Sequence, residues 1–240
     1  MKELNGRTAL ITGASGGIGS CIARRLAQSG VRVALCGRDA EKLQNTQDAL
    51  PEGAESLLLS GDLLDDAFLK DCPARTAERF GGLDILVNCA GMALSQPFAE
   101  TPISLYDRIM ALNARAPYLL MQSSLPYLRQ SDRAEIVNIT SVCAQKGYPL
   151  QSAYAASKHA LAGMSKSLAA EVYPIGIRVH LVSPGGVFTD MVRIARPDLT
   201  PEGMILPEDV AEITAFLLEH RTNAVVDQVE VHRAGKEPFL

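Results

Sequence analysis

Two residues four positions apart, Tyr154 and Lys158, could carry out acid–base chemistry together. The apolar spacing of this segment predicts a helix from about Ala153 to Val172, and positions i and i+4 share one face of a helix. A tyrosine releases a proton near neutral pH only if its pKa falls from about 10 toward 7, which corresponds to about 4 kcal/mol. An ammonium about 4 Å away supplies an energy of that order at an effective dielectric constant of about 20. We therefore expect Lys158 to lower the pKa of Tyr154, without a metal.

A second candidate is the hydroxyl of Ser141, which could hold a substrate oxygen. Ser141 ends the predicted fifth strand, and ligands of parallel sheets bind at the carboxyl ends of the strands. Taken singly, Tyr154 and Lys158 could instead form a solvated helix face and Ser141 a cap at a strand end. No His is placed to activate Cys143, so we interpret this residue as a wall of the pocket. The four His and five Cys show neither zinc spacing nor a disulfide framework, so we expect no metal site.

A glycine-rich turn, T-G-A-S-G-G-I-G, extends from Thr12 to Gly19 between a predicted strand and a predicted helix. Glycines allow the backbone to turn sharply and to approach a pyrophosphate, and the helix N-terminus offers unpaired N–H groups and about half a positive charge. The spacing differs from the commonest G-x-G-x-x-G fingerprint, and a plain tight turn is the alternative. In this context the turn predicts a dinucleotide site.

Seven short apolar runs, bounded by Gly, Asn, Asp or Ser, predict seven β-strands. They are Thr8–Thr12, Val31–Cys36, Ser56–Ser60, Ile85–Asn88, Glu135–Ile139, Ile177–Val182 and Val225–Val231. Between them apolar residues recur every three or four positions, which indicates helices. Strands that are apolar throughout and alternate with helices predict a doubly wound α/β fold of the Rossmann type, with a parallel sheet flanked by helices. No linker or repeat interrupts the chain, so we expect a single domain over residues 1–240.

The segment Asp190–Leu206 is the long non-strand stretch that follows the sixth strand, and it contains two prolines and a glycine. Its position makes it a candidate lid over the carboxyl ends of the strands, and a plain surface connection is the alternative. Its apolar residues favour a lipophilic carbonyl compound of small to medium size. They are Met191, Val192, Ile194, Leu199, Met204 and Ile205. Arg193 and Arg196 could instead meet a carboxylate or a phosphate.

The composition excludes several classes of partner. The formal net charge is −4, with 23 Lys and Arg interspersed among 27 Asp and Glu, so no field would gather nucleic acid. No stretch approaches the roughly 20 apolar residues of a membrane-spanning helix, and nothing near Met1 resembles an export signal. With an odd number of Cys, we expect a soluble protein of the reducing cytoplasm.

The chain resembles the short-chain dehydrogenase/reductase family from end to end. The motif T-G-x-x-x-G-x-G is Thr12 to Gly19, the Asp-Leu pair after the third strand is Asp62-Leu63, and N-N-A-G is present as N-C-A-G from Asn88. Other positions of the resemblance are the catalytic Asn, Ser, Tyr and Lys (Asn113, Ser141, Tyr154, Lys158) and the P-G followed by Thr (Pro184, Gly185, Thr189). Two departures are Cys89 within N-C-A-G, and a C-terminal segment from Asp227 to Arg233 in place of the usual T-G-Q and D-G-G signatures.

The resemblance implies roles for these residues. Tyr154 would be the general acid in reduction, Lys158 would also bind the nicotinamide ribose, and Ser141 would orient the substrate oxygen. Asn113, in a long helix that we expect from about Ser104 to Arg129, would hold a proton-relay water behind Lys158. The implied cofactor contacts are Gly13, Ser15, Gly17, Ile18, Gly19, Arg38, Asp62, Leu63, Asn88, Ala90, Tyr154, Lys158, Pro184, Gly185, Val187 and Thr189.

The end of the second strand addresses the choice of cofactor. In NAD-selective relatives an acidic side chain there binds both ribose hydroxyls and would repel a 2′-phosphate. Here that position is Gly37, and Arg38 follows it with a planar fork of donors suited to a phosphate. We expect Asp39 to point away and to cap the helix from Ala40. NADP(H) is therefore the predicted cofactor and NAD(H) the second possibility; a solvent-facing Arg38 is the alternative.

The predicted function is an NADP(H)-dependent oxidoreductase that moves a hydride between nicotinamide and a small-molecule carbonyl or alcohol. A sensor of the nicotinamide pool has no need for a Tyr activated by Lys, and an epimerase or dehydratase acting on sugar nucleotides carries a larger C-terminal domain than this chain can hold. The resemblance also implies a homotetramer or homodimer that pairs through the long helices Ser104–Arg129 and Ala153–Val172.

Overall fold

The sheet in the computed structural model, which describes residues 4–195 and 200–236, has seven parallel strands in the order β3-β2-β1-β4-β5-β6-β7. This order reverses direction between β1 and β4, as expected for a doubly wound sheet. The strands are β1 (Thr8–Thr12), β2 (Arg32–Gly37), β3 (Ser56–Ser60), β4 (Ile85–Asn88), β5 (Glu135–Ile139), β6 (Arg178–Pro184) and β7 (Gln228–Val231). The predicted fold class is confirmed.

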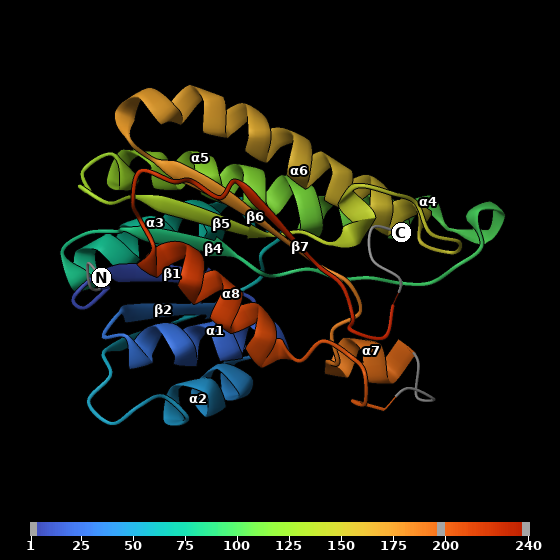
Figure 1. Cartoon of the computed structure of the whole chain (residues 1–240), viewed down its shortest axis with the longest axis horizontal. Helices are drawn as coiled ribbons and strands as arrows, with labels where there is room; N and C mark the ends of the chain where they lie inside the picture. The colour runs from blue at the N-terminus through green and yellow to red at the C-terminus, as the bar shows by residue number, and fades with distance from the viewer. Residues whose placement is uncertain (1–3, 196–199, 237–240) are drawn as a thin grey trace.

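Helices cover both faces of the sheet (Figure 1). They are α1 (Gly17–Gln28), α2 (Ala40–Asp48), α3 (Asp66–Phe80), α4 (Ile103–Met110), α5 (Ala116–Leu128), α6 (Ser152–Val172), α7 (Asp190–Ala195) and α8 (Pro207–Glu219). Residues of α1 and α8 pack on one face and residues of α3, α5 and α6 on the other. Short 3₁₀ turns occur at Phe98–Glu100, Val142–Ala144 and Tyr173–Ile175.

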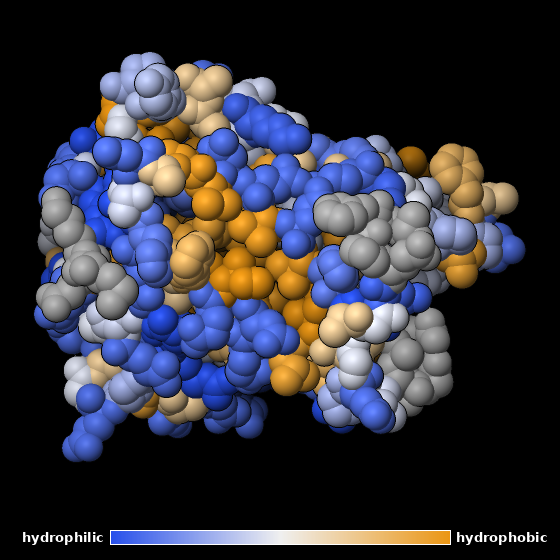
Figure 2. All heavy atoms as spheres, in the orientation of Figure 1, coloured by the Kyte–Doolittle hydropathy of each residue, from blue (hydrophilic) through white to orange (hydrophobic). Residues whose placement is uncertain are grey.

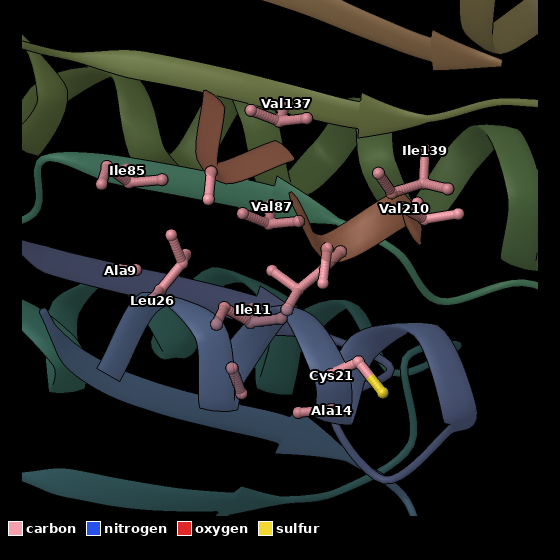
Figure 3. Packing of buried hydrophobic residues seen from close by; sticks show 14 of the residues in the cluster. Ala9, Ile11, Ala14, Cys21, Leu26, Ile85, Val87, Val137, Ile139 and Val210 are labelled. Atoms are coloured by element: carbon pink, nitrogen blue, oxygen red, sulfur yellow. The ribbon is translucent and has the colours of Figure 1, made fainter. Parts of the chain in front are cut away.

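Each central strand contributes side chains to two hydrophobic cores, one on each face of the sheet. Ala9 and Ile11 of β1 face α1, whereas Leu10 between them faces the opposite layer with α3 and α5. This division follows from the period of two along a strand, and it explains why the strands are apolar throughout rather than alternating. Figure 3 shows one of the two cores, in which Ile85, Val87 and neighbouring strand residues lie beside the helices of that face.

The bounds of four elements differ from those that the sequence predicts. The second strand spans Arg32–Gly37 rather than Val31–Cys36. The last strand begins at Gln228 rather than Val225, because Val225 and Val226 lie largely exposed in the preceding loop. The sixth strand continues to Pro184. The long helix expected from Ser104 to Arg129 consists of α4, a π-helical turn at Ala111–Arg115, and α5.

The proposed lid segment, 190–206, contains α7. Near its end, Ile205 forms a β-bridge with Val187 in the loop that follows β6. Residues 196–199, including Arg196 and Leu199, lie outside the described residues. In the part of the chain that the structure describes, no helix is long and apolar enough to cross a membrane.

Candidate active site

The glycine-rich turn lies between β1 and α1 and must stay close to the loop that follows β4. Gly13 has a φ of +67°, and a Cβ on it would lie 2.8 Å from Ala90 Cα. A side chain there would be both strained and in collision with the backbone. A Cβ on Gly19 would meet the carbonyl oxygen of Gly13. Thr12 joins the same two loops, because its Oγ1 accepts hydrogen bonds from the backbone N–H groups of Cys89 at 3.1 Å and Ala90 at 3.2 Å.

The N-terminus of α1 differs from those of α2 and α3. Asp39 caps α2 by accepting the N–H of Lys42 at 3.0 Å, and Asp65 caps α3 by accepting the N–H of Ala67 at 2.8 Å. The N-cap of α1 is Gly16, which has no side chain to accept these bonds. The first N–H groups of α1 are therefore left for a ligand, and an anion is the ligand that a helix N-terminus favours. This geometry fits a dinucleotide pyrophosphate.

One cleft contains nearly all the predicted cofactor contacts. Its volume of about 1340 Å³ exceeds the range of about 300–1,000 Å³ typical of a small-ligand site. It therefore has room for a dinucleotide together with a substrate. The predicted residues that line it are Gly13, Ser15, Gly17, Ile18, Gly19, Arg38, Asp62, Leu63, Ala90, Ser141, Tyr154, Lys158, Pro184, Gly185, Val187 and Thr189.

Two predicted residues, Asn88 and Asn113, are not part of the cleft lining. Asn88 is buried behind it and donates a hydrogen bond from Nδ2 to Asn138 Oδ1 at 2.8 Å. The amide of Asn113 is fixed on both sides, because its Oδ1 accepts the N–H of Met92 at 2.9 Å and its Nδ2 donates to Met92 O at 2.8 Å. Nδ2 also lies 3.0 Å from Ser157 Oγ.

Asn113 and Lys158 converge on Gly91. A Cβ on Gly91 would lie 3.3 Å from Asn113 Oδ1 and 3.7 Å from Lys158 Nζ, so both polar groups reach the space beside this glycine. The π-helical turn at Ala111–Arg115 is what presents Asn113. Such turns insert a residue into an α-helix and occur frequently at functional sites. No signal in the sequence indicated the turn.

The three reactive side chains of the cleft come from two adjoining elements. Ser141 follows β5 by two residues, and its Oγ accepts the N–H of Cys143 at 3.2 Å. Tyr154 and Lys158 lie one turn apart on α6, and Lys158 Nζ lies 5.8 Å from the centre of the Tyr154 ring. The ammonium donates a hydrogen bond to the carbonyl oxygen of Ile139, the last residue of β5, at 2.9 Å.

Burial is the largest influence on the pKa values of Tyr154 and Lys158. It raises the pKa of Tyr154 to about 12, against a smaller lowering from a hydrogen bond with Ser141. It lowers the pKa of Lys158 to about 8. The prediction that Lys158 lowers the pKa of Tyr154 toward 7 is wrong for this structure. It assumed a separation of about 4 Å between the two groups, whereas Nζ is directed to Ile139 and both groups are removed from water.

The loop that follows β6 is held in place by β7 and by the start of α1. Gly185 donates its N–H to Val231 O at 2.7 Å, which fixes the loop after β6 against the last strand. A Cβ on Gly17 would lie 3.2 Å from Thr189 Cγ2, so the loop after β6 also packs against the start of α1. Residues from β6 to Thr189 thereby close the cleft opposite Ala90.

Sequence reasoning missed several cations of the cleft. Lys42, one turn after Arg38 at the start of α2, lines the same end of it. Its position in the first turn of the helix that follows Arg38 is the signal in the sequence that could have indicated it. At the other end the cleft is lined by Arg108, Lys146, His232, Arg233 and Lys236. These come from α4, the loop after β5 and the segment after β7.

The arrangement defines a class of protein: a doubly wound dinucleotide-binding fold that brings a Ser, a Tyr and a Lys to the carboxyl edge of its sheet. Residues 7–200 match the family model "short chain dehydrogenase". The chain belongs to this family. It is therefore an oxidoreductase that transfers a hydride between a nicotinamide cofactor and a CH–OH or C=O group.

Individual relatives match over almost the whole chain. The chain is 33% identical to the D-beta-hydroxybutyrate dehydrogenase of Rhizobium meliloti (strain 1021) over 85% of this chain and 80% of that protein. It is 34% identical to the 3-oxoacyl-(acyl-carrier-protein) reductase of Rickettsia bellii (strain RML369-C) over 95% of each. The crystal structure of a short chain dehydrogenase from Burkholderia cenocepacia J2315 in complex with NADP has a TM-score of 0.86 and 31% identity, and it covers 97% of this chain and 98% of that chain.

Proposed function

We propose that this chain is an NADP(H)-preferring carbonyl reductase or alcohol dehydrogenase in which Ser141, Tyr154 and Lys158 act on the substrate oxygen. The observation that supports it most is that these side chains line the same cleft as an α1 N-terminus without a side-chain cap. A cofactor bound along the glycine-rich turn would bring its reactive end to the carboxyl edge of the sheet. The bound nicotinamide would supply the hydride.

The protein's own groups would handle the proton. The hydroxyl of Tyr154, with its raised pKa, is protonated at neutral pH and so is available as the general acid for a carbonyl oxygen. Ser141 would orient that oxygen. Lys158, with a pKa of about 8, is mostly charged at pH 7 and would bind the nicotinamide ribose. Asn113 faces the same space beside Gly91 and would hold a relay water behind Lys158.

The preference for NADP(H) rests on the end of β2. Arg38 and Lys42 line the cleft there, and Asp39 is engaged in capping α2. A Cβ on Gly37 would lie 2.8 Å from Ser15 Oγ, so the packing disfavours an acidic side chain at that position. Two cations suit a 2′-phosphate, and the Asp39 carboxylate beside them accepts the backbone N–H of Lys42. The solved relative in complex with NADP agrees with this choice.

The cofactor proposal is tested with two variants. Arg38→Ala should raise the KM for NADPH far more than that for NADH, and Lys42→Ala should do the same to a smaller extent. Steady-state kinetics at a saturating substrate concentration measures both. Equal kcat/KM for the two cofactors in the unmodified protein would remove the preference.

The segment 190–206 is proposed as a lid of the single domain. Val192 and Asp190 line the cleft, while Ile205 is buried against Val187 and anchors the end of the segment. Arg193 lies beside Asp190 at 3.2 Å, which makes it a less suitable partner for a substrate anion. The apolar part of the lining favours a lipophilic carbonyl compound of small to medium size.

We also propose a homo-oligomer, first a tetramer and otherwise a dimer, paired through α4, α5 and α6. A tetramer with two-fold symmetry needs a further contact surface. Figure 2 shows hydrophobic side chains gathered in the middle of one face, in the region where Figure 1 draws β7 between α8 and α6. Phe216, Val225 and Val226 are between 41% and 51% exposed. Light scattering that finds only a 25.7 kDa species would refute both assemblies.

The five free thiols suit a reducing compartment, and we propose the cytoplasm.

The activity itself is tested with a panel of ketones, oxoacyl thioesters, steroids and sugars, measured by the loss of NADPH absorbance. At least one carbonyl compound should be reduced, and no added metal ion should be required. Turnover of polyols alone would contradict the lipophilic substrate. A protein that binds NADPH tightly but reduces no carbonyl compound, oxo acids included, would support a cofactor sensor instead.

A further inference from the structure

The end of the cleft far from Arg38 carries an excess of positive charge. It is lined by four side chains that are cationic at neutral pH: Arg108, Lys146, Arg233 and Lys236. The carboxylate that lines this end is Asp190, which faces Arg193 at 3.2 Å. The acidic side chain at the end of β7, Glu230, accepts a hydrogen bond from Gln228 Nε2 at 3.2 Å. Among the described residues that line this end, four cations therefore face one carboxylate, Asp190.

Arg233 is one of the two cations of this group that are partly buried. It directly follows β7 and His232 and is half-buried, as Lys146 is, whereas Arg108 and Lys236 are exposed. Its Nε lies 3.8 Å from the position of a Cβ on Gly186, and Gly186 itself lines the cleft. Its Nη1 donates to the Sδ of Met204 at 3.2 Å. A thioether is a weak acceptor, and a guanidinium has five N–H donors in a fixed fork.

The position of Arg233 in the sheet brings it near the reaction centre. Ser141 follows β5, Gly186 follows β6, and Arg233 follows β7, so the three residues lie at the carboxyl ends of adjacent strands. Arg38 follows β2, on the other side of β1. Arg233 is the last residue of the segment from Asp227 to Arg233, and its backbone position is set by β7. The 2′-phosphate already has Arg38 and Lys42 at the other end.

We propose that Arg233 binds a carboxylate carried by the substrate, and that the enzyme acts on an oxo acid or hydroxy acid with a short apolar body. The inference rests on the proposed reductase function and names the substrate class of the same site. A carboxylate matches the planar fork of an arginine through paired hydrogen bonds. Val142 and Val192 would contact the apolar body, and Ser141 and Tyr154 would hold the carbonyl oxygen. The exposed Arg108 and Lys236 would attract the anion to the opening.

The test compares compounds that differ only in charge. The 2-, 3- and 4-oxo acids of five carbons are assayed with NADPH beside their methyl esters, using the unmodified protein and the variants Arg233→Gln, Arg233→Lys and Arg75→Gln. Arg75 lies on α3 beside Asp71 and outside the cleft, and its variant removes the same charge. Binding is measured separately by titrating butanoate, or neutral butanamide, into the protein loaded with NADP⁺. Thermal unfolding of each variant checks that it folds.

The unmodified protein should reduce at least one oxo acid with a higher kcat/KM than its ester. Arg233→Gln should raise the KM for that acid about 10- to 100-fold, the range expected for lost charged hydrogen bonds, with a smaller effect on kcat and none on the ester. The KM of Arg233→Lys for the acid should lie between those of the unmodified protein and Arg233→Gln. The KM of Arg75→Gln should match that of the unmodified protein. Butanoate should bind more tightly than butanamide, and this difference should disappear in Arg233→Gln.

The inference would be overturned if esters were used as well as acids, or if butanoate were bound no better than butanamide. An effect of Arg233→Gln on the KM for NADPH alone would also overturn it, because that residue would then serve the cofactor. Arg233-dependent binding of butanoate without reduction of any carbonyl compound would contradict the reductase function while supporting the carboxylate subsite. The two proposals therefore fail in different ways.

Discussion

A buried charge lies at each end of strand β5, and the two charges differ in the partners that surround them. Glu135, the first residue of the strand, is 1% exposed, and Lys158, whose ammonium binds the carbonyl of the last residue, Ile139, is 4% exposed. Removing either charge from water costs several kcal/mol unless partners compensate. The partners are present at one end and nearly absent at the other.

At the amino end, three basic side chains surround the carboxylate of Glu135. Arg221 Nη1 lies 3.2 Å from it, His180 Nε2 3.5 Å and Arg133 Nε 3.8 Å. These residues are themselves tied to the backbone, for example His180 Nδ1 to Val226 O at 2.7 Å. The network joins β5 and β6 to the segment that connects α8 with β7. Its role is structural, since no residue of it lines the cleft.

At the carboxyl end, Lys158 has the carbonyl oxygen of Ile139 as its hydrogen-bond partner, and no carboxylate of the described residues lies within ion-pair distance. Burial lowers its pKa to about 8 in consequence. A buried charge without a counter-charge is expensive, and such groups with shifted pKa values concentrate at functional sites. The comparison thus separates a charge that joins elements of the fold from a charge in the cleft that we propose to serve the reaction.

The largest effect is expected from Tyr154→Phe, a substitution in the cleft at the carboxyl end of β5. Removing the proposed general acid should lower kcat at least about 1,000-fold, within the range known for such groups. The binding of NADPH and the thermal midpoint should change little, because the ring stays in place. Activity is measured on an established substrate and cofactor binding by fluorescence titration. A residual rate above a few per cent would show that Tyr154 is not the acid.

The next effect is expected at the structural end. Glu135→Gln leaves two arginines near a neutral amide, and breaking a buried pair costs about 3–5 kcal/mol. At about 2–4 °C per kcal/mol for a chain of this size, the midpoint should fall by about 6–20 °C. The activity of the folded protein at 20 °C should be retained.

Glu212→Gln is the matched control for that substitution. Glu212 faces Arg25 at 2.9 Å between α8 and α1, but its side chain is 66% exposed. Its loss should cost less than about 1 kcal/mol. Equal losses of stability in the two variants would show that burial does not set the value of the Glu135 network.

The fold and most of the site were predictable because their signals are local. Strands that are apolar on both faces and the turn from Thr12 to Gly19 are properties of short segments. The start of β7 was misplaced because Val225 and Val226 are apolar yet exposed, and hydrophobicity alone does not distinguish such a loop from a strand. The π-helical turn that presents Asn113 has no sequence signature. Arg233 reaches the cleft only through the pairing of β7 with β6, which is a long-range contact.

A gain of stability is expected from Lys158→Met. The shift of its pKa from 10.5 to about 8 corresponds to about 3 kcal/mol of unfavourable burial at neutral pH, and the lost hydrogen bond to Ile139 returns part of it. We expect the variant to be more stable by about 1–3 kcal/mol at pH 7 and to be inactive. Urea unfolding at pH 7 measures the change. A destabilised Lys158→Met would mean that the ammonium contributes to the fold, as Glu135 does.

The smallest effect is a dependence on pH that has opposite signs for activity and stability. Above pH 8 Lys158 loses its charge, while Tyr154 keeps its proton up to about pH 12. If the charge is required, kcat/KM for carbonyl reduction at saturating NADPH should be level near pH 7 and fall toward tenfold per unit above about pH 8. Lys158 binds its proton more weakly in the folded chain than in the unfolded chain, whose pKa is near 10.5. The unfolded state therefore holds more protons between pH 8 and 10, and the contribution of Lys158 to stability rises across that window. The difference in unfolding free energy between Lys158→Met and the unmodified protein should shrink from pH 8 to pH 10, as the activity of the latter declines. A rate that stays level to pH 10 would show that the charge of Lys158 is not needed, and a constant stability difference would show that its pKa is not lowered by burial.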